Sequence, residues 1–190
     1  MKKFIGLGLL SLFLVTACSK KEDTFSMSNG QVGPLKKSVQ LKQIDSIFAN
    51  DSLVKLNPNQ GALGTQGEVE VYEKGGDLLL LITPMDERDP SSLIQNIQIF
   101  DPRYTTDKGI TMDSNFGQLK AAYEIGSIQT TISSVVVFLK NSDIYVTIDK
   151  QQLPENLRYN PSIKIEALQI PDEAVFKYMM VGWDHQAPSE

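Results

Sequence analysis

The sequence predicts an α+β protein made of two tandem units, each a helix followed by three antiparallel strands (α-β-β-β). Two observations indicate this fold. A helical stripe of apolar residues beginning at Leu41 is repeated from Phe116, an offset of 75 (116 − 41), and a hairpin-like segment from Val69 is repeated from Val135, an offset of 66 (135 − 69). Internal repeats of this kind decide the architecture. We therefore expect one unit over 33–106 and another over 107–185, each with its helix on its own small sheet.

Each unit is expected to begin with a short amphipathic helix. The two apolar stripes consist of Leu41, Ile44, Ile47 and Phe48, and of Phe116, Leu119, Ala122 and Tyr123. This spacing places the apolar side chains on one helical face. Ser38 is the expected N-cap of the first helix, and Asp113 or Ser114 that of the second, because their side-chain oxygens accept hydrogen bonds from free backbone N–H groups.

A β-hairpin is expected after each helix, in "VEVYEKGGDLLLLI" (69–82) and "VVVFLKNSDIYVTI" (135–148). Gly75-Gly76 and Asn141-Ser142 are the expected two-residue turns, the first more strongly because glycine adopts positive φ without steric cost. In the first hairpin such a turn places Lys74 opposite Asp77. In the second hairpin it places Lys140 opposite Asp143, so that each turn is flanked by a cross-strand charge pair.

A third strand completes each predicted unit, in "IQNIQIFD" (94–101) and "IEALQIPD" (165–172), and the second unit adds "VFKYMMVGW" (175–183). The difference between the two repeat offsets locates extra residues in the first unit, within the loop 56–67. The alternative is a single continuous sheet, in which the similarity of the two halves has no structural meaning.

Strand parity predicts a working surface on the hairpins. In the second hairpin the aliphatic residues alternate onto one face, which must meet the helix, and Phe138 and Tyr145 share the other. In the first hairpin the matching outer face carries Tyr72. These outer faces are too apolar for a freely solvated sheet. We therefore take Tyr72, Phe138 and Tyr145 as a candidate binding surface; the alternative is that the two halves cover them by packing together.

The N-terminus reads as an export signal. A cationic head precedes an apolar stretch, Phe4–Val15, that is shorter than the roughly 20 residues of a membrane-spanning helix. The following "VTAC" (15–18) resembles the lipobox of bacterial lipoproteins. The resemblance implies that residues 1–17 are removed as a signal peptide and that Cys18 is acylated. Residues 18–32 are then expected to be a tether, and 186–190 a tail.

The same resemblance implies a location. In lipoprotein sorting an aspartate after the cysteine favours the inner membrane, and this chain has Ser19, which favours the outer membrane. The charged run 20–23 is similar to export tags that direct lipoproteins to the cell surface. Together with "VGPL" (32–35), "ITP" (82–84) and an aromatic strand ending at Trp183, these features look similar to small lipoproteins regulated by envelope stress, which carry a domain of unknown function. That resemblance implies a location and no chemistry.

Composition restricts the chemistry further. The net charge of −5 argues against nucleic acid as a partner. An acylated Cys18 supplies neither a nucleophile nor a disulfide, and the single histidine, His185, lies next to the expected tail. The acidic stretch Asp86, Glu87 and Asp89 could hold calcium, but a solvated turn fits it better because the EF-hand spacing is absent. We expect no cofactor and no metal.

Two functional classes remain. The favoured one is a non-enzymatic binding module, anchored in the membrane by its lipid, for an envelope protein, a glycan or a cell-wall component. The alternative is a hydrolase that uses a carboxylate pair, Asp101 with Asp107 or Asp113, of which one acid stays protonated. Convergence of two of these carboxylates in one pocket would favour the hydrolase.

Overall fold

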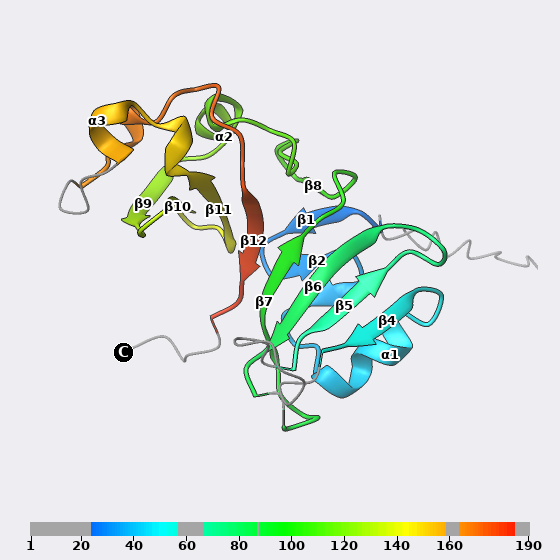
Figure 1. Cartoon of the computed structure of the whole chain (residues 1–190). Coiled ribbons are helices and arrows are strands. Elements are labelled where there is room, and N and C mark those ends of the chain that lie inside the picture. Colours follow the sequence, from blue (N-terminus) through cyan, green and yellow to red (C-terminus); the bar gives the residue numbers. More distant parts are fainter. Residues whose placement is uncertain (1–23, 57–66, 87, 159–163, 185–190) are drawn as a thin grey trace, which may run out of the picture.

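Strands dominate the computed structural model, which describes residues 24–56, 67–86, 88–158 and 164–184. Eight strands form one large sheet and four form a smaller one (Figure 1). The helices between them are one or two turns long. None of the helices in the described part of the chain combines the length and the hydrophobicity needed to cross a membrane.

The large sheet is antiparallel throughout and has the strand order β4-β5-β6-β7-β12-β11-β10-β9. Its first half contains β4 (Ser52–Lys55), β5 (Val69–Tyr72), β6 (Leu78–Pro84) and β7 (Ile94–Ile99). Its second half contains β9 (Ile125–Thr130), β10 (Ser134–Leu139), β11 (Ile144–Asp149) and β12 (Tyr178–Gly182). The two halves join at the centre, where Ile97 of β7 pairs with Val181 of β12.

The predicted α+β fold of two separate α-β-β-β units is therefore wrong. Each half supplies four strands, and the pairing of β7 with β12 makes them one continuous sheet. The segment 165–172, matched above to β7, contains instead a 3-10 turn, η3 (Ala167–Gln169), and β12 occupies the place beside β7. The local similarity of the two segments does not determine which one pairs in the sheet, because pairing depends on distant partners.

The smaller sheet has the order β3-β2-β1-β8. It comprises β1 (Ser26–Ser28), β2 (Gln31–Val32), β3 (Leu35–Lys36) and β8 (Thr105–Thr106), with β1 and β8 parallel. The side chains of Met27 and Val32 are fully buried. Within the segment 18–32, expected to be a tether, residues 24–32 therefore belong to the folded body.

Both predicted helices form, but their caps lie elsewhere. The first is a 3-10 turn, η1 (Leu41–Gln43), that continues into α1 (Ile44–Ile47), and the second is α2 (Phe116–Ala122). Asn115, and not Asp113 or Ser114, caps α2: its Oδ1 accepts from the amide of Gln118, whose side chain accepts from the amide of Asn115. Gln40, not Ser38, occupies the N-cap position of η1. The remaining short helices are η2 (Lys150–Gln152) and α3 (Glu155–Arg158).

The two central hairpins share a register over most of their length. In the first hairpin Val69 pairs with Ile82 and Val71 with Leu80. In the second, Val135 pairs with Ile148 and Val137 with Val146, at the same offset of 66. A bulge after Val71 then shifts the first hairpin, so that its turn brings the Glu73 amide, not Lys74, to the Asp77 carbonyl. The second hairpin has no bulge, and Asn141 adopts the positive φ, 54°, that its turn requires.

The inner face of the large sheet meets the small sheet and the helices in one hydrophobic core. Strand parity predicted this face correctly for the second hairpin, whose inward side chains are all buried: Val135, Val137, Leu139, Ile144, Val146 and Ile148. Ile44, which begins α1, Phe48, which follows its end, and Phe116 and Leu119 of α2 belong to the same core. Burial of each large apolar side chain contributes about 1.5–3 kcal/mol to folding, so the core, rather than the short helices, stabilises the fold.

Polar contacts fix the small sheet to the large one at two places. At one, the Arg103 guanidinium contacts both carboxylate oxygens of Asp101, donates to Glu73 at 3.0 Å and lies 4.2 Å from the ring centre of Phe25. At the other, the β1–β2 turn contacts the β10–β11 turn: Asn29 donates to the carbonyl of Asn141 at 2.8 Å. The Gly30 amide donates to Asp143 Oδ2 at 2.7 Å, and Asn29 Oδ1 accepts from the Asp143 amide.

Candidate functional site

One continuous row of side chains crosses the outer face of the large sheet, opposite the core. Cross-strand pairing runs through all eight strands in the order Val54, Glu70, Leu81, Gln98, Met180, Tyr145, Phe138 and Ser127. None of these eight side chains is fully buried. The row is apolar and aromatic around Met180, Tyr145 and Phe138, which is unusual for an antiparallel sheet surface facing water.

A groove of about 650 Å³ opens on this face, over β7, β12, β11 and β10. We call it the outer-face groove and define it by its aromatic residues Phe138, Tyr145 and Trp183 and its amide residues Gln95, Asn96 and Gln129. Its volume falls in the range of small-ligand sites. Figure 1 shows the four strands that form its floor.

Tyr145 organises the groove. Its ring stacks on that of Phe138, with centroids 5.2 Å apart and planes inclined by 26°. Its hydroxyl donates to Asn96 Oδ1 at 3.0 Å, so the side chain reaches from β11 across β12 to β7. Gly182 of β12 lies beneath it: a Cβ there would lie 3.0 Å from Tyr145 Cε1. The absence of a side chain at Gly182 is what lets the tyrosine cross.

Among the described residues that line the groove, none has a basic side chain. Its two ionisable carboxylates, Asp143 and Asp184, lie at one end, and Asp143 Oδ2 already accepts from the Gly30 amide. Burial raises the pKa of the Tyr145 hydroxyl above its ordinary value, so this group stays neutral and able to donate at physiological pH. The site is therefore neutral to weakly acidic.

Trp183 forms part of the groove wall, although its side chain is only 2% exposed. Of the buried side-chain nitrogen and oxygen atoms in the described residues, only its indole Nε1 has no hydrogen-bond partner. A buried donor without a partner costs free energy and calls for an explanation. Trp183 belongs to the hydrophobic core, so this buried nitrogen is not a contact that the groove offers to a ligand.

Two of the three predicted surface residues come together in this groove, and the third does not. Phe138 and Tyr145 stack on neighbouring strands, whereas Tyr72 lies on β5, in the other half of the sheet, and donates to Glu70 at 2.9 Å. All three side chains are partly exposed. Sequence reasoning missed Asn96, Gly182 and Trp183, because only the long-range pairing of β7, β12 and β11 places them beside Tyr145.

A second groove, of about 530 Å³, lies between the β1–β2 and β10–β11 turns. The polar side chains that line it already contact one another. Lys140 pairs with Glu124 at 2.8 Å, and the Tyr123 hydroxyl donates to Asp107 at 2.7 Å. Lys108 donates to the carbonyl of Ala122. These contacts leave few polar groups for a ligand.

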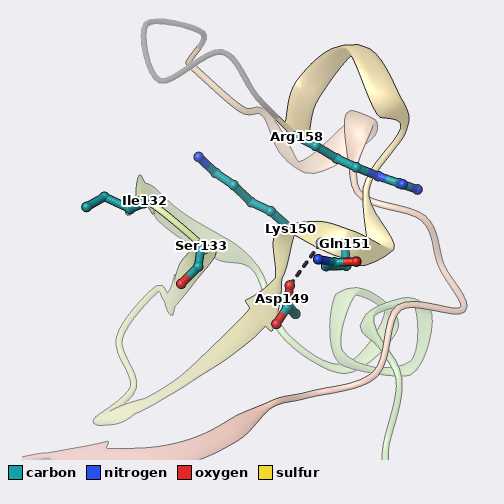
Figure 2. Close-up of a pocket in the computed structure, with 6 residues that line it drawn as sticks. All are labelled: Ile132, Ser133, Asp149, Lys150, Gln151 and Arg158. Carbon is teal, nitrogen blue, oxygen red and sulfur yellow. Dashed lines mark hydrogen bonds between the residues drawn. The ribbon is translucent and has the colours of Figure 1, made fainter.

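A third cavity, of about 190 Å³, lies between the β9–β10 turn and η2. It contains two basic residues, Lys150 and Arg158, but Figure 2 shows their charged ends pointing to opposite sides. Asp149 accepts from the Gln151 amide, as the dashed line in Figure 2 marks, and pairs with Lys177 at 3.3 Å. The two basic groups do not converge, so the cavity does not form an anion site.

The carboxylates proposed for a hydrolase have separate partners. Asp101 is held by Arg103, whose hydrogen bonds keep the pKa of Asp101 below its ordinary value despite burial, so it is a poor general acid. Asp107 accepts from Tyr123, and Asp113 lies exposed in the turn before α2. None of the three grooves described above contains two of these residues.

Three residues discussed in the sequence analysis lie outside the described residues: Cys18, His185, and Glu87 of the calcium candidate. The flanking acids of the calcium candidate form turn contacts: Asp86 accepts from the Arg88 amide and Asp89 from the Ser91 amide. In the part of the chain that the structure describes, no three His, Cys, Asp or Glu side chains are grouped as a metal site would require.

Comparison with known proteins informs the fold alone. No protein family and no curated protein matches the sequence. The structure is similar to the crystal structure of the uncharacterized protein yfeY from Escherichia coli, with a TM-score of 0.50 and 16% sequence identity. The similarity covers 85% of this chain and 100% of that chain.

Proposed function

We propose that this protein is a lipid-anchored envelope protein that binds a partner molecule non-enzymatically through the outer-face groove. The observation that supports this most is the groove itself, in which a stacked aromatic pair lies beside amide side chains that other described residues leave available. The side-chain amides of Gln95 and Gln129 make no hydrogen bond to another described residue, although the Gln95 carbonyl accepts from the Trp183 amide. An apolar surface with a few polar groups is the usual composition of a binding site.

The anchor belongs to the same proposal. The "VTAC" motif supports acylation of Cys18, and Ser19 supports outer-membrane sorting, with the domain facing the periplasm or the cell surface. Five residues separate Cys18 from Thr24, the first described residue. Six backbone steps span at most about 20 Å when fully extended. The folded domain would therefore remain close to the bilayer, and its ligand would be found in that layer.

The hydrolase alternative has less support. Asp101, Asp107 and Asp113 do not line a common groove, and the lowered pKa of Asp101 opposes the protonated role that such a mechanism needs. The outer-face groove contains no histidine or cysteine among its described residues. Binding without catalysis is the function that we propose.

Capture of the protein by an isolated cell-envelope fraction tests this function. Phe138→Ala removes one ring of the stacked pair and should reduce capture. Tyr72→Ala is the matched control, because Tyr72 lies on the same outer face but outside the groove. Both variants lose a partly exposed aromatic side chain and should lose similar thermal stability. Equal capture by both variants would contradict the proposal.

A further inference from the structure

We propose that the ligand of the outer-face groove is a neutral glycan. This inference rests on the binding function proposed above and adds the chemical class of the ligand. Its first basis is charge. The described residues that line the groove include no Lys, Arg or His, and the carboxylates of Asp143 and Asp184 lie at one end. Among these described residues an anionic ligand would meet like charge and no basic partner, and so is disfavoured.

The second basis is the kind of hydrogen-bonding group present. Gln95, Asn96 and Gln129 each have a side-chain amide, which both donates and accepts. The Oδ1 of Asn96 accepts from the Tyr145 hydroxyl, and its side-chain nitrogen, Nδ2, has no hydrogen bond to another described residue. Sugar hydroxyl groups also both donate and accept, so amides of this kind complement them without any charge.

The third basis excludes a common alternative, an extended peptide. Peptides usually bind by adding a strand to an open sheet edge, where main-chain groups are available. The floor of this groove is made mainly by β7, β12, β11 and β10, each paired on both sides, and only Gln129 comes from the edge strand β9. Recognition over the four inner strands uses side chains. The stacked rings of Phe138 and Tyr145 supply an apolar surface for the C–H face of a sugar ring, beside the amides that would hold its hydroxyls.

Titration of the full mature chain carrying Cys18→Ser tests the inference. The neutral probes are cellotetraose and chitotetraose, the acidic probe is tetragalacturonic acid, and a neutral tetrapeptide represents the protein class. Binding is followed through the amide NMR signals of Asn96, Tyr145 and Gly182 and by calorimetry. We expect a neutral sugar to shift these signals and tetragalacturonic acid to leave them unchanged.

Matched variants locate the binding. Tyr145→Ala should weaken sugar binding about tenfold, as the loss of one aromatic contact predicts, whereas Tyr72→Ala should leave it unchanged. If the peptide or the acidic probe shifts the groove signals and neither sugar does, the glycan inference fails while the binding function stands. If no probe shifts them, or if Tyr145→Ala binds sugar as tightly as the wild type, the inference is overturned.

Discussion

Tyr145 reaches across an intervening strand to donate a hydrogen bond to Asn96 at 3.0 Å, and it can do so because Gly182 lies beneath its ring. The three residues come from three neighbouring strands, β11, β7 and β12. Their contact fixes both the aromatic and the amide side of the outer-face groove. Changes at Gly182 should therefore affect the groove before they affect the fold.

Gly182→Ala tests this relationship. The new Cβ would lie 3.0 Å from Tyr145 Cε1 and 3.2 Å from Asn96 Oδ1, which displaces both side chains. Alanine also removes about 0.5–1 kcal/mol of the entropic cost that glycine has in a strand, so the melting temperature should change little. We expect weaker capture by the envelope fraction at nearly unchanged thermal stability, measured by calorimetry on the same samples. If capture and thermal stability fall together, Gly182 serves folding instead of the groove.

Arg103→Ala should destabilise the fold by about 1–3 kcal/mol, because it leaves the buried carboxylate of Asp101 without its charged partner. Chemical denaturation measures the effect. Arg88→Ala is the control, since the Arg88 side chain is largely exposed and its Nε lies as far as 3.6 Å from Asp86 Oδ1. A surface pair of this kind contributes little. Similar effects of the two substitutions would contradict the structural role of Arg103.

The Arg103 contact also predicts a pH dependence. Hydrogen bonds from Arg103 lower the folded-state pKa of Asp101, so the stabilisation is present above the unfolded-state pKa of about 3.9 and is lost as the pH falls through the folded-state value. The difference in unfolding free energy between wild type and Arg103→Ala should thus be constant near neutral pH and shrink below about pH 4. A difference that is the same at every pH would contradict the assignment.

Asn29→Ala should loosen the small sheet from the β10–β11 turn. The substitution removes the hydrogen bonds to the Asn141 carbonyl and from the Asp143 amide, at a cost of about 0.5–1.5 kcal/mol. Hydrogen exchange should therefore quicken at the amides of Gly30 and Asp143. Ser28→Ala, an exposed neighbour with no side-chain hydrogen bond to another described residue, is the control and should leave both amides protected. Unchanged exchange in Asn29→Ala would show that the two turns are held by other contacts.

Cys18→Ser should release the protein from the membrane fraction and abolish labelling by a clickable fatty acid. Both results follow if Cys18 is the lipid attachment point. Fractionation with metabolic labelling measures them together, and protease treatment of intact cells distinguishes display on the cell surface from a periplasm-facing orientation. A wild-type chain that takes up no fatty acid would refute the anchor.

Local sequence patterns predicted the elements well and their assembly poorly. The two apolar stripes became helices, and alternation in "VVVFLKNSDIYVTI" correctly separated the buried Val135 and Val146 from the partly exposed Phe138 and Tyr145. These features depend on residues close together in the chain. The fold class was wrong because it depends on β7 pairing with β12, strands separated by most of the second half.

The candidate site shows the same division. The stack of Phe138 on Tyr145 follows from one hairpin and could be predicted, whereas the Asn96 contact and the gap at Gly182 require the long-range strand order. The folded state of residues 24–32 was also missed, because "SMSNGQV" is polar apart from Met27 and Val32, the two side chains that enter the core. Two buried residues in a polar segment are too weak a signal to predict a strand pair.

Photo-crosslinking in intact cells examines whether the outer-face groove is the working surface. A photoreactive phenylalanine analogue replaces Gln95 at the groove, and in a separate chain it replaces the exposed Asp45 of α1, which lies outside the groove. We predict that Gln95 yields crosslinked products that Asp45 does not, and that adding Tyr145→Ala removes them. Equal products from both positions, or products from Gln95 that persist with Tyr145→Ala, would contradict binding in the groove.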